Sequence, residues 1–296
     1  MSLKNSRWVP IAAIWISAMC AAVCYGQALS PNWEELTGPD FVTAIQQAQG
    51  VCLIPFGIIE KHGPTGPLGT DLLNVRYATF EAARQEYAIV FPEYYAGQIF
   101  EAKHQPGTIA YSTHLQLEML QETTAEMARN GCTKIALISG HGGNTNLMQY
   151  FAQTQLETPK DWVLYVVNNT PGANSSVPGP SKPGADGHAG ELEMSNVMAH
   201  RPELVHPERA GQQSGADLKR EDLPPGVYTG IWWYASFPNH YQGDAAGANA
   251  ARGKAAMGAR ASSIAAAIRS MKADQVSPRL QREFFEAAKH PLNTKQ

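Results

Sequence analysis

Histidine and carboxylate side chains are concentrated in one turn near residue 60. Glu60 and His62 follow the apolar run VCLIPFG, and Asp71 comes shortly after them in a stretch broken by glycine and proline. Imidazole and carboxylate ligands together suit zinc, manganese or iron(II), whereas calcium prefers oxygen ligands and structural zinc is mostly bound by sulfur. Taken alone, this turn could equally be a helix cap with surface charges, because Asp is common at helix starts.

Two further polar clusters follow apolar runs later in the chain. His141 stands in SGHGGN, and His188, Glu191 and Glu193 stand in GHAGELEMS. In a parallel sheet the carboxyl ends of the strands meet at one edge, where ligands bind. We therefore expect the three clusters to form one metal site. If residues 189–199 are helical, Glu191 and Glu193 point to different sides, so only one of them can join it.

The elements that must position these side chains alternate along the chain. Short apolar runs predict strands at 51–59, 88–91, 134–140 and 162–168, and their lack of polar positions is typical of strands covered on both faces. Helical patterns cover 72–87, 145–156, 246–272 and a segment that begins with a capping box at Thr113 and stops at Gly131. This alternation predicts a largely parallel sheet with helices on both faces. Residues 170–187 predict a long loop, and we expect one domain.

The first 28 residues read as a leader. Lys4 and Arg7 precede an apolar stretch, and small residues surround a possible cut after Ala28. We predict a signal peptide at 1–28, a single domain at 29–296, and export to the periplasm or the extracellular space. The alternative is an uncleaved membrane anchor. A net charge of −3 with no block of like charge predicts no nucleic-acid partner and no stable membrane association after cleavage.

Only two cysteines remain after such a cleavage, Cys52 and Cys132. Two are too few for a disulfide framework. Both are therefore predicted to be buried, inert thiols rather than redox groups or zinc ligands.

The combination of EKHGPTGPLGTD, HQPGTIAYS at 104–112, SGHGGN and HAGELEMS resembles the creatininase (creatinine amidohydrolase) family in order and spacing, over most of residues 50–245. The resemblance implies an α/β fold, a three-layer sandwich with a central, mostly parallel sheet flanked by helices. It implies a metal-dependent hydrolase that cleaves a non-peptide or cyclic C–N (amide) bond in a small-molecule amide substrate. One or two divalent ions per chain are expected, zinc first and manganese or iron as alternatives. A homo-oligomer is also implied, with a hexamer as one form.

Site residues are carried over from this family by position. Glu60, Asp71 and His141 match the ligands of one metal, and His62 with the shared Asp71 matches those of a second. Glu193 matches the active-site glutamate.

For catalysis we predict Glu193 as the general base and His188 beside it as the group that stabilises the oxyanion.

Departures from the family pattern concern the second metal and the substrate. Creatininase itself has a glutamate where this chain has Gly143, so the second metal loses a ligand unless Glu193 or Glu191 supplies one. Thr65 and Met194 also differ from the usual residues, which argues against creatinine as the substrate. The alternatives are a formamide hydrolase, a peptidase-like relative acting on a modified peptide or cofactor precursor, and a non-catalytic exported metal-binding protein.

The other histidines and the tryptophan pair are harder to assign. His104 precedes a turn that resembles the family's active-site rim. Trp232 and Trp233 could form a lid over the site or belong to the core. The remaining histidines are predicted to be surface or structural residues: His114, His200, His206, His240 and His290.

Overall fold

The computed structural model describes residues 29–168 and 177–293. The predicted signal peptide at 1–28 lies outside the described residues, as does part of the predicted loop at 170–187. Within the described ranges, no helix combines the length and the apolar character needed to cross a membrane.

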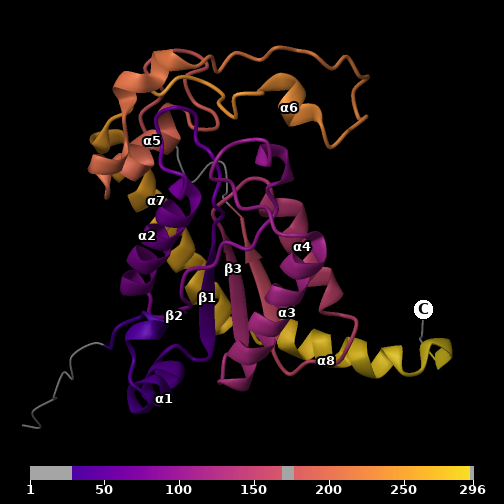
Figure 1. Cartoon of the computed structure of the whole chain (residues 1–296). Coiled ribbons are helices and arrows are strands. Elements are labelled where there is room, and N and C mark those ends of the chain that lie inside the picture. The colour runs from indigo at the N-terminus through magenta and orange to yellow at the C-terminus, as the bar shows by residue number, and fades with distance from the viewer. Residues whose placement is uncertain (1–28, 169–176, 294–296) are drawn as a thin grey trace, which may run out of the picture.

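A sheet of four parallel strands forms the centre of the molecule (Figure 1). The strands lie in the order β2-β1-β3-β4, and β1 pairs with β3 from Val51 opposite Lys134 to Phe56 opposite Ser139. All of them coincide with predicted strands, each somewhat shorter than the apolar run that indicated it. Their bounds are β1 Val51–Phe56, β2 Ile89–Val90, β3 Lys134–Ser139 and β4 Val163–Val167.

Helices cover both faces of this sheet, which confirms the predicted three-layer α/β sandwich. Leu53 and Ala136 point to one face and pack with residues of α2 (Thr70–Gln85) and α7 (Ala250–Ala273). Ile54 and Leu137 point to the other face and pack with residues of α1 (Gly38–Gln47), α3 (Thr113–Arg129) and α4 (Asn144–Thr154). Since both faces are buried, the strands need apolar residues at every position.

Some predicted helix boundaries are wrong, and three helices were not predicted. Helix α3 is capped by Ser112, whose Oγ accepts a hydrogen bond from the Leu115 N–H at 3.3 Å, so Thr113 is the first helical residue instead of the cap. Helix α7 begins at Ala250 instead of 246, because the Asn249 side chain accepts from the Arg252 N–H at 2.9 Å. The helices without a sequence prediction are α1, α6 (Trp232–Ser236) and α8 (Val276–Ala288).

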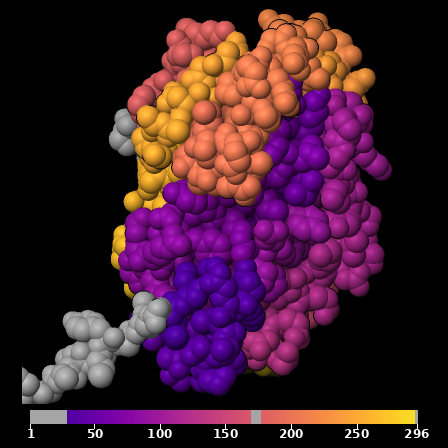
Figure 2. All heavy atoms as spheres, turned by 60° about the vertical axis from the view of Figure 1, so that its left-hand side comes forward, coloured from indigo at the N-terminus to yellow at the C-terminus, as the bar shows by residue number. Residues whose placement is uncertain are grey.

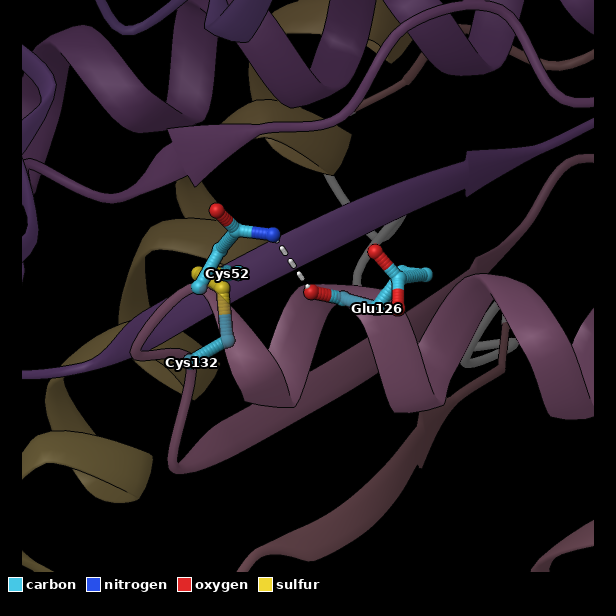
Figure 3. The surroundings of a disulfide bond; sticks show 4 residues. Cys52, Glu126 and Cys132 are labelled. Carbon is cyan, nitrogen blue, oxygen red and sulfur yellow. Dashed lines mark hydrogen bonds between the residues drawn. A yellow bond between two sulfur atoms is a disulfide. The ribbon is translucent and has the colours of Figure 1, made fainter. Parts of the chain in front are cut away.

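Cys52 and Cys132 form a disulfide, so the prediction of two inert thiols is wrong (Figure 3). Cys132 lies in the turn before β3, and β3 places Ile135 opposite Cys52 on β1. This pairing brings the two Cα atoms within 5.8 Å, although the cysteines are 80 residues apart in the sequence. Counting cysteines could not reveal the bond, because only the strand register makes them neighbours.

Candidate metal centre

The sequence-predicted metal ligands meet at the carboxyl edge of the sheet. Glu60 and His62 follow β1, His141 follows β3, and Asp71 is the second residue of α2. Gly57 allows this arrangement, because a Cβ at that position would lie only 2.5 Å from the Cα of Leu72 in the first turn of α2. The start of α2 therefore packs directly against the end of β1, and Asp71 comes close to Glu60.

Three ligand atoms converge on one point in this cluster. Nδ1 of His141 lies 3.0 Å from Oε1 of Glu60 and 3.0 Å from Oδ2 of Asp71. Both carboxylate oxygens are buried and have no hydrogen-bond partner. Buried polar atoms are normally paired, and an unpaired set of this composition fits a divalent transition ion.

A second group of ligand atoms adjoins the first around His62. Its Nδ1 donates to the backbone carbonyl of Glu60 at 3.2 Å, and its Nε2 is buried without a partner. That nitrogen lies 3.5 Å from Oδ1 of Asp71 and 3.8 Å from Oε2 of Glu193. A ring held by one nitrogen to a carbonyl, with the other nitrogen free, is the usual arrangement of a metal-binding histidine. Asp71 therefore directs one carboxylate oxygen toward His141 and the other toward His62.

The charges of the cluster favour a cation. Burial raises the pKa of Glu60, but the charge and hydrogen bond of His141 and the hydrogen bond of His240 oppose it, and that pKa lies well below its usual range. Burial lowers the pKa of His62, yet the carboxylates of Asp71, Glu60 and Glu193 prevail and raise it to about 9. In the metal-free protein the histidine is thus protonated at neutral pH, and its proton supplies the positive charge that a metal ion would replace.

Glu193 and Glu191 lie on helix α5 (Glu191–Met198) and point in different directions, as expected from helix geometry. Oε2 of Glu193 accepts a hydrogen bond from the Ala189 N–H at 2.6 Å, and its side chain is 35% exposed to the cavity. Burial is the main cause that raises its pKa to about 7, and the negative charge of Asp71 adds to it. Glu191 instead binds Arg252 Nη1 at 3.2 Å, away from this site. It cannot supply the ligand that Gly143 lacks.

His188 joins the site as a neutral ring. Its Nε2 donates to the carbonyl of Lys61 at 3.0 Å, and its ring centre lies 4.5 Å from that of His62. Burial lowers its pKa to about 3. Because Nε2 carries the proton, the lone pair is on Nδ1, and a role as hydrogen-bond donor to an oxyanion would require the bond to Lys61 to break.

His240 is a site residue that sequence analysis placed among the surface or structural histidines. It is 1% exposed, and its Nε2 contacts Oε2 of Glu60. Its Nδ1 accepts a hydrogen bond from Nε1 of Trp233 at 2.9 Å. The sequence signal was its place three residues after the aromatic cluster at 232–237, which could have been interpreted as a wall of the site.

A cavity of about 480 Å³ lies in front of these side chains. Figure 1 shows the segment with α6 arching over this end of the sheet, and Figure 2 shows it packed against earlier parts of the chain. Trp233 packs edge-on against His188, and Trp232, which is 41% exposed, also lines the cavity. A second cavity of about 610 Å³, which includes His104, shares Glu101 and Tyr228 with the first. His104 therefore lies near the rim, as its sequence context suggested.

The space beside Gly143 is too small for a side chain. A Cβ there would lie 2.5 Å from Nε2 of His141 and 3.2 Å from Oε1 of Glu101. Glycine lets the ring of His141 occupy this space.

Comparisons with known proteins agree with this geometry. The family model for creatinine amidohydrolase matches residues 34–268. The mycofactocin precursor peptide peptidase of Mycolicibacterium smegmatis is 29% identical over 161 residues, which are 52% of this chain and 59% of that protein. The creatinine amidohydrolase of Pseudomonas putida is 26% identical over 116 residues, 38% of this chain and 45% of that protein. The chain thus matches about half the length of these curated relatives.

Solved creatininase structures share the fold. A structure described as creatininase Mn superposes with a TM-score of 0.67 and 20% identity, covering 83% of this chain and all of that one. A mutant creatininase of Zn-Zn type gives the same TM-score, identity and coverage. Together with the match over 34–268, the parallel sheet and the ligand cluster at its carboxyl edge show that the chain belongs to the creatinine amidohydrolase (creatininase) family.

Proposed function

We propose that the protein is a metal-dependent hydrolase of an amide C–N bond, with one or two ions per chain, zinc first and manganese or iron as alternatives. The observation that carries this proposal is the set of buried, unpartnered ligand atoms from Glu60, His62 and Asp71 beside His141. Glu60, Asp71 and His141 would hold one ion, and His62 with the shared Asp71, whose Oδ1 lies 3.5 Å from Nε2 of His62, would supply the ligands of a second. A bound ion would supply Lewis acidity, which polarises a carbonyl and lowers the pKa of water.

Glu193 would move the proton. It borders the cavity next to both ligand groups, and its raised pKa of about 7 suits a residue that accepts a proton from water and returns it to the leaving nitrogen. His188, neutral and hydrogen-bonded to the carbonyl of Lys61, lines the same cavity and would contact the reacting groups there.

The substrate is proposed to be a small amide such as a lactam or formamide. A second candidate is a modified peptide, which the adjoining cavity of about 610 Å³ favours because it provides room beyond the ligand cluster. A relative is named as a precursor peptide peptidase, which agrees with this candidate.

One experiment tests the activity. Protein stripped of metal and reloaded with zinc or manganese is assayed against lactams, formamides and short peptides. We expect metal-dependent turnover of one class. Full metal occupancy without turnover of any class would instead support a non-catalytic metal-binding protein.

We also propose that the protein is exported and forms a homo-oligomer. The disulfide between Cys52 and Cys132 supports export, because disulfides persist in oxidising compartments. N-terminal sequencing of the exported protein should begin at Leu29, and light scattering should give the oligomeric mass. An intact Met1 on cytoplasmic protein would contradict export.

A further inference from the structure

We propose that His240 is a positioning residue for the metal centre: it fixes the carboxylate of Glu60 through a hydrogen bond whose direction is set by Trp233. The inference rests on the proposed metal site. It concerns a histidine that family resemblance did not place in that site.

The two oxygens of the Glu60 carboxylate have different neighbours. Oε1 faces Nδ1 of His141 at 3.0 Å and has no hydrogen-bond partner, so it is free to bind an ion. Oε2 contacts Nε2 of His240. Both side chains are almost completely buried. A bond to Oε2 therefore limits rotation of the carboxylate and keeps Oε1 directed at His141 and Asp71.

Trp233 determines which nitrogen of His240 carries the proton. An indole N–H can only donate, so Nδ1 of His240, 2.9 Å away, must accept. The neutral imidazole then has its proton on Nε2 and donates it to Glu60. This argues against a further metal site at Glu60, His188 and His240, although their ligand atoms lie within 4.8 Å of one another. The Nε2 lone pair that such a site needs is absent from this tautomer.

The backbone also holds His240 at the metal turn. Its φ is +51°, a left-handed conformation that is rare for residues other than glycine and that persists only where the surroundings enforce it. Its carbonyl accepts from the N–H of Gly63, the residue after His62, at 3.1 Å, and its own N–H donates to Phe237 at 2.9 Å. The aromatic segment and the ligand turn are thus connected through His240.

Groups that hydrogen-bond to a metal ligand orient it, and their loss typically weakens metal binding by about 10–100-fold. We therefore expect His240→Leu to weaken zinc affinity by about that factor, measured by competition with a chelator. His240→Gln offers an amide N–H at a similar reach and should keep most of the affinity. The number of ions per chain and the visible spectrum of the cobalt-loaded protein should stay unchanged in both variants, because no ligand is removed.

A matched pair of tryptophan variants tests the role of the indole N–H. Trp233→Phe removes the donor to Nδ1 but keeps an aromatic ring, and it should weaken zinc affinity. Trp232→Phe makes the same change in the neighbouring residue. The ring centre of Trp232 lies 5.3 Å from that of Trp233, and its indole does not bond to His240. It should leave zinc affinity as in the wild type.

The possible outcomes separate this inference from the proposed function. A wild-type chain that binds no ion would overturn the metal centre and the inference together. Wild-type binding with unchanged affinity in His240→Leu and Trp233→Phe would overturn only the inference. Loss of one ion per chain in His240→Gln, with a changed cobalt spectrum, would make His240 a ligand and overturn the positioning role. If His240→Leu fails to fold, His240→Gln and Trp233→Phe decide the question.

Discussion

Glu191 and Glu193 are two residues apart on helix α5, yet their surroundings differ in kind. Glu191 is 2% exposed, and its carboxylate accepts hydrogen bonds from the Ser181 N–H at 3.0 Å and from Arg252 at 3.2 Å. Arg252 in turn donates to both oxygens of Asp186, at 2.7 and 2.6 Å. Every charge in this region has a partner of opposite sign.

The region around Glu193 is compensated by imidazoles, among them the protonated ring of His62, and its polar atoms are not all paired. It contains the carboxylates of Glu60 and Asp71 and the rings of His62 and His141, and each of these four has a buried polar atom without a hydrogen-bond partner. No arginine or lysine contacts these carboxylates in the ion pairs of the described residues. Removal of one partner from a buried charged cluster with all bonds made destabilises the fold, whereas a cluster with aligned free ligand atoms is available to bind an ion.

The strongest test of this difference removes the shared ligand. Asp71→Ala deletes the carboxylate that faces both ligand groups. We expect loss of bound metal from the purified protein and, with it, loss of turnover. Elemental analysis compares the metal content of Asp71→Ala with that of Glu191→Ala, which should retain its metal. Equal, full occupancy in both variants would contradict the assignment.

The next test changes only the proton-accepting group. Glu193→Gln keeps the size of the side chain, and turnover should fall by about 10²–10⁴ if Glu193 is the general base. Metal content should change little. If one ion per chain is lost instead, Glu193 is mainly a ligand that compensates for Gly143. Full activity together with full metal content would remove Glu193 from the mechanism.

Metal affinity should also depend on pH. In the metal-free protein the pKa of His62 is raised to about 9, so at pH 7 its ring must lose a proton before it can bind an ion. Glu60 and Asp71 also raise the pKa of His141 well above its usual range, so both ligand histidines must release a proton. Zinc affinity should therefore rise more than tenfold per pH unit between pH 7 and 8. Calorimetry in two buffers of different ionisation enthalpy measures the released protons. An affinity independent of pH over this range would mean that His62 is not a ligand.

A glutamine in place of Glu191, the carboxylate that pairs with Arg252, should affect the stability of the fold instead of catalysis. Glu191→Gln removes the charge opposite Arg252 and weakens a buried hydrogen bond, which costs about 1–3 kcal/mol. The melting temperature should fall by several degrees, while the activity per bound metal ion stays close to that of the wild type. A large loss of turnover in folded Glu191→Gln would erase the distinction between the two regions.

The sequence predicted the parts of this site that depend on local order. Glu60, His62 and His141 were placed correctly relative to the sheet because each follows an apolar strand, and the strands have a strong signal. His240 was missed because its contact with Glu60 joins segments 180 residues apart and depends on the fold of an aromatic loop without regular periodicity. The bond between Cys52 and Cys132 was missed for the same reason, since it depends on strand register. Helix caps were displaced by one to four residues, because side chains such as Asn249 decide the start of a helix.

The smallest expected effect concerns the glycine pair of the SGHGGN turn. Gly143→Ala places a methyl group 2.5 Å from Nε2 of His141, so the ring must shift away from Glu60 and Asp71. Crowding of this kind costs about 1–3 kcal/mol, and we expect zinc affinity to fall about tenfold or less. Gly142→Ala is the matched control, because a Cβ at that position meets nothing within 4 Å. Both variants carry the same change in backbone entropy, so a difference between them in a chelator competition measures the displacement of His141 alone. Equal affinities would show that His141 tolerates the methyl group and that Gly143 is not needed to keep its ring in place.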